Sequence, residues 1–101
     1  MSSMEWLFKP IAVGSLKLKN RLVMPPMNDS LAAADGSVTD RQIRYYEERA
    51  KGGVGLIITG NAYVDEKKGR ISAAQFACFN DRYIPRLRSA IRDAYHLARR
   101  L

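Results

Sequence analysis

The segment Thr39–Thr59, TDRQIRYYEERAKGGVGLIIT, decides the fold because a helix with defined ends runs directly into an apolar strand. Thr39 and Gln42 form a capping-box pattern, in which the threonine side chain accepts from the Gln42 amide while the Gln42 side chain reaches back. An apolar face follows at helical spacing, made of Ile43, Tyr46 and Ala50. Gly52-Gly53 is a typical helix stop. The pattern predicts a helix over residues 40–51.

The apolar run at residues 54–59 follows this stop without polar alternation. Such a run is typical of a parallel strand that is covered on both faces. A second strand is predicted upstream at residues 21–24, and Pro25-Pro26 must end it because two prolines remove two backbone donors and fix φ.

Other segments complete an α/β pattern. Residues 11–18 read as a hairpin with Gly14-Ser15 at its turn, residues 60–80 as a long irregular connection, and residues 84–100 as a helix. Strands that alternate with helices indicate a parallel architecture. Only two βα units fit, so both sheet edges are expected to be bare and open to self-association.

Composition narrows the possible partners. The formal net charge is +7, with 17 Lys and Arg against 10 Asp and Glu, but the basic residues are spread along the chain without interleaved aromatic residues. We therefore expect a solvated basic exterior, with no nucleic acid and no membrane as partner. No leader segment is visible in the sequence, and the expected location is cytoplasmic.

Three features that resemble functional sites have simpler interpretations. Gly52-Gly53-Val54-Gly55 precedes a strand, whereas a phosphate loop follows one. The single histidine, His96, lacks partners for catalysis or metal binding, and we expect a surface or packing role. The single cysteine, Cys78, is expected to be a half-buried apolar residue, because no base can be named for it. No metal site is predicted.

An ordered set of motifs resembles the Old Yellow Enzyme (NADH:flavin oxidoreductase) family over nearly the whole chain. The motifs are Leu7-Phe8-Lys9-Pro10, Leu18-Lys19-Asn20-Arg21-Leu22-Val23-Met24, Pro25-Pro26-Met27, Asp35-Gly36, Tyr45-Tyr46, Arg49-Ala50, Gly52-Gly53-Val54-Gly55-Leu56-Ile57-Ile58, Gly69-Arg70, Asp81, Ile84-Pro85, Leu87-Arg88 and Ala94-Tyr95-His96. The resemblance implies a (β/α)8 TIM barrel with FMN at the carboxyl ends of its strands. Such a barrel needs about 250 residues. This chain would supply the N-terminal hairpin and the first two βα units, an incomplete barrel.

The resemblance also implies the cofactor-binding residues. Pro25, Pro26, Met27 and Asn28 correspond to the segment after the first barrel strand that lines the isoalloxazine ring, although a Pro-rich strand exit needs no such role. Asn28 stands where many members have Thr or Cys near the flavin carbonyl. Asn61 stands where the family usually has Ala or Gly and where a backbone N–H contacts the flavin.

The resemblance implies an ene-reductase-like activity, in which NAD(P)H reduces the flavin and the flavin reduces a small activated alkene or enone. The family's catalytic tyrosine, substrate-binding pair and phosphate site would lie beyond Leu101, so no catalytic residue is assigned. Tyr45 and Tyr46 are expected on the outer helix, away from the barrel mouth. Two alternatives stay open: a non-enzymatic βα fragment that is oligomeric or completes a partner, and a small basic nucleic-acid binder.

Overall fold

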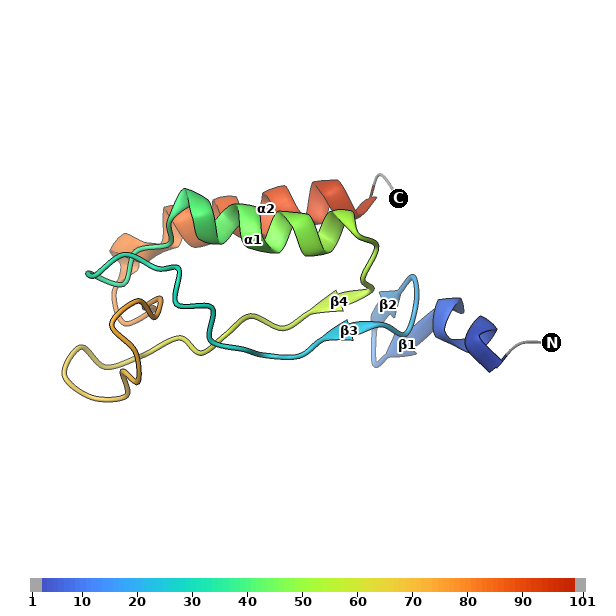
Figure 1. The fold of residues 1–101 in the computed structure, drawn as a ribbon, viewed down its shortest axis with the longest axis horizontal. Coiled ribbons are helices and arrows are strands. Elements are labelled where there is room, and N and C mark those ends of the chain that lie inside the picture. The colour runs from blue at the N-terminus through green and yellow to red at the C-terminus, as the bar shows by residue number, and fades with distance from the viewer. Residues whose placement is uncertain (1–2, 100–101) are drawn as a thin grey trace.

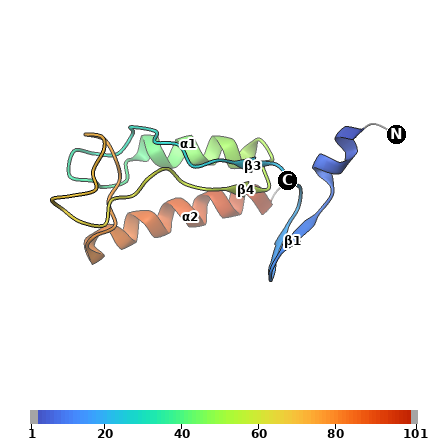
Figure 2. The same ribbon diagram turned by 90° about the horizontal axis from the view of Figure 1, so that it is seen from below.

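The computed structural model describes residues 3–99, with side chains for residues 4–94. The chain forms an elongated body of 52 × 24 × 24 Å. At one end lie the short helix η1 (Ser3–Phe8) and the hairpin β1 (Ile11–Val13) and β2 (Leu16–Leu18), which project from the body (Figures 1 and 2). Gly14 begins the hairpin turn with φ of 61°, a value that glycine adopts without steric cost.

The body contains a two-stranded parallel sheet and two helices. Strand β3 (Val23–Met24) pairs with β4 (Leu56–Ile57) in the register Val23↔Leu56 and Met24↔Ile57. Helices α1 (Asp40–Lys51) and α2 (Ile84–Arg99) pack against each other on the same side of the sheet (Figure 1). A short helix, η2 (Asp81–Tyr83), leads into α2.

The ends of α1 follow from its sequence. Thr39 has an extended backbone, and its hydroxyl accepts from the Gln42 N–H at 3.1 Å. At the other end, Gly53 has φ of 99°, and its N–H donates to the Ala50 carbonyl. The helix covers the residues expected. The reciprocal part of the predicted capping box is absent, because the Gln42 side chain donates to Asp29 instead.

Both barrel-type strands are shorter than expected. Strand β3 starts at Val23 rather than at residue 21, and β4 covers only Leu56–Ile57 of the predicted 54–59. The expected burial of both faces is wrong as well, since Leu56 and Ile57 are half-buried and Ile58 is 44% exposed. The reason is that each strand has one neighbour and the helices cover one face of the sheet. The helix predicted to residue 100 is described to Arg99.

Much of the core lies beneath the long connection rather than on the sheet. Residues 60–80 contain no helix, yet Tyr63, Gln75, Phe76 and Ala77 are buried. Tyr63 and Ala77 form a parallel bridge, and Ala77 N–H donates to the Gly36 carbonyl at 2.9 Å. The connection is therefore folded against the loop that precedes α1.

Candidate functional site

The two strands bring their carboxyl ends to the same end of the molecule. The pairing continues one step past β4, because Ile58 N–H donates to the Met24 carbonyl at 3.1 Å. Pro25 follows β3 directly. The segments that leave β3 and β4, residues 25–29 and 58–61, are called the strand exits, and they run beside each other (Figure 1). In open and closed α/β folds this edge of the sheet carries the ligand site.

The sequence-predicted site residues lie on these two exits. Pro25, Pro26, Met27 and Asn28 are exposed, as is Asn61. The exits touch through backbone atoms, since a Cβ atom at Gly60 would overlap the Met27 carbonyl and lie 3.2 Å from the Asn28 Cα. The structure thus brings the Gly60–Asn61 segment next to Met27 and Asn28, although α1 separates the two segments in the chain.

The chemistry of this surface suits one side of a flavin. Two prolines present apolar rings without N–H groups, and the Met27 side chain is 46% exposed. The Asn28 Oδ1 accepts from the Ser30 N–H at 3.3 Å, and its Nδ2 has no partner among residues 3–99. A flat apolar ring with carbonyl acceptors on its rim fits such a surface, with the Asn28 amide as donor.

A buried polar cluster lies directly behind this surface, and sequence reasoning missed it. Gln42 of α1 is 2% exposed, and its Nε2 lies 3.2 Å from both carboxylate oxygens of Asp29. The Asp29 Oδ1 also accepts from the Leu31 N–H at 2.9 Å. Tyr46, one helical turn after Gln42, accepts from the Gly60 N–H at 2.9 Å through its hydroxyl. We call Asp29, Gln42, Tyr46 and Gly60 the exit cluster.

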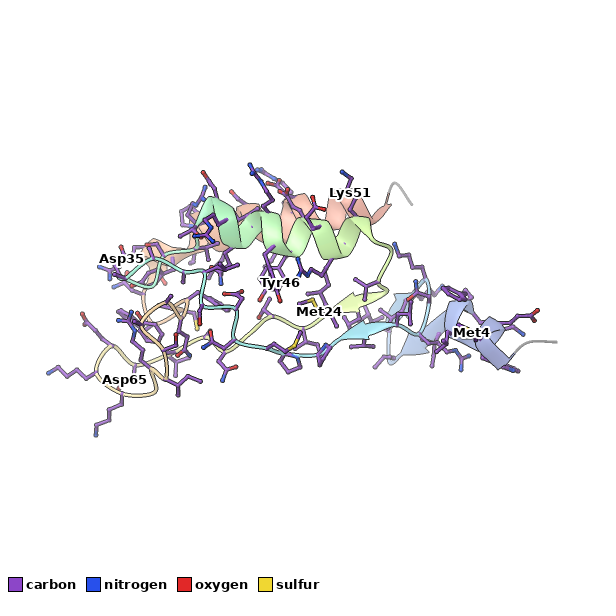
Figure 3. The ribbon with its side chains drawn as sticks, viewed as in Figure 1. Met4, Met24, Asp35, Tyr46, Lys51 and Asp65 are labelled. Atoms are coloured by element: carbon purple, nitrogen blue, oxygen red, sulfur yellow. The ribbon has the colours of Figure 1, made fainter. Side chains whose placement is uncertain are left out.

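The position of Tyr46 agrees with the helical spacing of the sequence. Tyr46 lies on the apolar face of α1 that was predicted with Ile43 and Ala50, and its side chain is 7% exposed and points from α1 toward the strands (Figure 3). Burial, opposed by the Gly60 hydrogen bond and reinforced by the Asp29 carboxylate, raises the pKa of Tyr46 to about 12. The Tyr46 hydroxyl is buried and bound to the Gly60 backbone instead of opening onto the exposed exits, so Tyr46 is a structural group of the exit cluster.

A second buried amide fixes the opposite ends of the strands. Asn20 is 8% exposed, its Nδ2 donates to the Gly53 carbonyl at 2.7 Å, and its Oδ1 accepts from the Leu22 N–H at 3.0 Å. Asn20 therefore joins the segment before β3 to the segment after α1. Its signal in the sequence was its place in the family motif, which alone gave no physical role.

The remaining candidate features of the sequence contribute no residue to this site. Cys78 is exposed, which corrects the expectation of a half-buried thiol. The His96 side chain lies outside the described residues. Within residues 3–99 no group of three His, Cys, Asp or Glu side chains could hold a metal ion. In the same part of the chain, neither helix combines the length and the apolar composition needed to cross a bilayer.

Comparison with known proteins agrees with this geometry. The model of the NADH:flavin oxidoreductase / NADH oxidase family matches residues 6–97. An NADH oxidase from Thermoanaerobacter brockii is 49% identical over 78 residues, covering 77% of this chain and 12% of the relative. A cinnamate reductase from Clostridium sporogenes is 42% identical over 73 residues, covering 71% of this chain and 11% of the relative.

The solved structures support the fold. Old Yellow Enzyme from Pichia sp. superposes with a TM-score of 0.83 at 31% identity, covering 92% of this chain and 24% of that one. The chain thus spans about an eighth of the curated relatives named above and about a quarter of this barrel. The predicted fold class, a hairpin and the first two βα units of a TIM barrel, is confirmed. The chain belongs to the NADH:flavin oxidoreductase / NADH oxidase family, the family of Old Yellow Enzyme.

Proposed function

We propose that this chain is the N-terminal, flavin-facing portion of an FMN-dependent, ene-reductase-like oxidoreductase. The observation that carries the proposal is the parallel pairing of β3 and β4, because it sets Pro25–Asn28 and Asn61 side by side at the carboxyl edge of the sheet. Antiparallel strands would have sent these segments to opposite ends. The cytoplasm is the proposed location.

The chemistry that bound FMN supplies is transfer of a hydride from NAD(P)H to an activated alkene or enone. Within this chain, Pro25 and Pro26 would form a stiff wall for the ring, and the Asn28 amide would donate to a ring carbonyl. Asn61 would contribute its backbone N–H. The similarity to a cinnamate reductase supports an alkene conjugated to a carbonyl group as the substrate class.

We further propose that the chain binds FMN weakly or not at all by itself. The surface at the two strand exits would cover one side of the isoalloxazine ring. In TIM barrels the phosphate site lies in the loops after strands seven and eight, whereas residues 3–99 supply only the first two barrel strands. Purifying the chain and recording its absorption spectrum tests this point. A stoichiometric yellow protein would contradict weak binding, while leaving the family chemistry intact.

A chimaera tests the function itself. The 78 residues of this chain that align with the Thermoanaerobacter NADH oxidase would replace the corresponding segment of that protein, with the unaltered parent protein as the positive control. We expect the chimaera to retain bound flavin, and Asn28→Ala to weaken binding about tenfold through loss of one hydrogen bond. Asn80→Ala is the matched control, because Asn80 is exposed and caps η2 by accepting from the Arg82 N–H. A folded chimaera without flavin would overturn the proposal.

A second candidate is a non-enzymatic module that completes a partner. Within residues 3–99, β3 and β4 pair only with each other, and the side chains of Val23 in β3 (46%) and Ile58 after β4 (44%) are exposed. Unpaired parallel edges with apolar side chains favour addition of a strand from another chain. Size-exclusion chromatography with light scattering distinguishes the two, since a monodisperse oligomer supports this candidate and a monomer contradicts self-association.

A further inference from the structure

We propose that Tyr46 is a positioning residue: its hydroxyl group fixes the Thr59–Gly60 peptide, and so sets the point at Gly60 from which the backbone that faces the flavin continues. This inference rests on the proposed function. Tyr46 itself does not reach the exposed surface, because its side chain lies on the inner side of the two strand exits (Figure 3). It acts through Gly60.

The Gly60 N–H lies beyond the last hydrogen bond between the two strands, so it has no acceptor in the sheet. The last ladder bond on this side is from Ile58 to Met24, and Gly60 is buried against the Met27 carbonyl. A buried N–H without a partner is costly, so this peptide needs an acceptor that comes from outside the sheet. The Tyr46 hydroxyl, 2.9 Å away, is that acceptor.

The Gly60 bond fixes the peptide that precedes the one assigned to the flavin. The Gly60 N–H belongs to the Thr59–Gly60 peptide, so its bond to the Tyr46 hydroxyl limits how that peptide plane is rotated. Gly60 carries no side chain, and its closest neighbours are backbone atoms of Met27 and Asn28, which limit where its Cα lies. The Asn61 N–H belongs to the next peptide, which starts from this Cα, so a rotated Thr59–Gly60 peptide would displace the N–H group that we assign to the flavin.

The same helix holds the other exit. Gln42 donates to both Asp29 oxygens, and Asp29 in turn accepts from the Leu31 N–H. Asp29 is the residue after Asn28, and its carboxylate lies beside the Tyr46 hydroxyl. Two side chains one turn apart on α1 thus fix both exit segments relative to one rigid element, which is how a binding site keeps its geometry.

The neighbouring tyrosine provides a matched control. Tyr45 packs edge to face against Tyr46, with ring centroids 5.2 Å apart, and Arg49 stacks on its ring. Its hydroxyl has no hydrogen-bond partner among residues 3–99. Tyr45→Phe therefore removes a hydroxyl group from the adjacent position. It keeps the ring that packs against Tyr46 and removes no hydrogen bond of the exit cluster.

The experiment has two stages. In the full chain, amide hydrogen exchange at Gly60 and the Asn61 amide chemical shift are measured for the unaltered protein, Tyr46→Phe and Tyr45→Phe. In the chimaera described above, FMN affinity and the flavin absorption band are measured for the same three forms. We expect Tyr46→Phe to accelerate amide exchange at Gly60 and to shift the Asn61 amide resonance. In the chimaera, Tyr46→Phe should weaken FMN binding about tenfold and displace the flavin absorption band. Tyr45→Phe should change none of these four quantities.

Each outcome has a defined meaning. Unchanged FMN affinity and an unchanged band in a folded Tyr46→Phe chimaera would overturn the positioning role while the proposed function stands. An unaltered chimaera without flavin would overturn both, even if Gly60 exchange responds as expected. Should Tyr46→Phe fail to fold, the unaltered full chain still tests the contact on which the role depends. Slow exchange of the Gly60 amide supports the role, and exchange as fast as that of an exposed amide contradicts it.

Discussion

The carbonyl oxygen of Met27 occupies the space in which a side chain at Gly60 would begin. Because the obstruction is backbone, a methyl group at residue 60 can be accommodated only by separating the two strand exits. We expect Gly60→Ala to lower the free energy of unfolding by about 2 kcal/mol, a typical cost of overpacking. Urea denaturation followed by far-ultraviolet circular dichroism measures this change.

Gly52→Ala is the control for that substitution. Gly52 has an ordinary φ of −71°, and a Cβ atom there would lie 3.4 Å from the nearest backbone oxygen, which is ordinary contact. Alanine restricts the unfolded chain at little cost to the folded one, so a gain of up to about 1 kcal/mol is expected. Equal destabilisation by both substitutions would mean that the exits do not pack as described.

The buried amide of Asn20 gives a second prediction. Asn20→Ala removes both its bond to the Gly53 carbonyl and its bond from the Leu22 N–H, leaving two backbone groups without partners. We expect a loss of about 2 kcal/mol in the free energy of unfolding. Asn80→Ala, the same change at an exposed helix cap, should cost about 1 kcal/mol or less. A reversed order of the two losses would contradict the role assigned to Asn20.

The titration of Tyr46 gives a third prediction. Its pKa in the folded chain is raised to about 12 from 10.0, because burial disfavours the phenolate. Because the pKa is raised on folding, the contribution of the neutral Tyr46 side chain to the free energy of unfolding is fully present below pH 10.0. This contribution is lost as the pH rises through about 12. Ultraviolet titration of tyrosinate should therefore contain a late step that Tyr46→Phe removes. A titration without a late step in the folded, unaltered chain would contradict the burial.

The ion pair between Asp40 of α1 and Arg86 of α2 gives a fourth prediction. Hydrogen bonding and charge attraction from Arg86 lower the pKa of Asp40 below 3.8. Its contribution to stability is therefore present above pH 3.8 and lost as the pH falls through the lowered value. Both side chains are exposed, so Asp40→Asn should have a small effect at neutral pH that salt diminishes further. A large effect that persists in high salt would contradict the exposed geometry.

Local signals predicted the elements better than their surroundings. The bounds of α1 could be read from Thr39 and Gly53 because capping and a positive φ depend on a few adjacent residues. The burial of Val54–Thr59 could not be, since it depends on which strands and helices pack on each face. Tyr46 shows the same limit for the site. Helical spacing placed it on the apolar face with Ile43, but only the structure shows that its hydroxyl reaches the Gly60 N–H.

The long connection shows a different limit. Tyr63 and Ala77 pair across thirteen intervening residues of irregular backbone, and the loop has no periodicity that would indicate burial. Irregular backbone is fixed by individual hydrogen bonds, such as that from Ala77 to Gly36. The proposed cofactor residues were predicted from the resemblance alone, because an exposed proline or asparagine has no distinguishing pattern of its own.

The contacts described above for the two strand exits join residues between Met24 and Gly60. A polypeptide is synthesised from its amino terminus, at about 5–20 residues per second. Every partner in these contacts is therefore synthesised before the rest of the long connection and α2, so the order of translation permits the two exits to align before the later segments pack on α1.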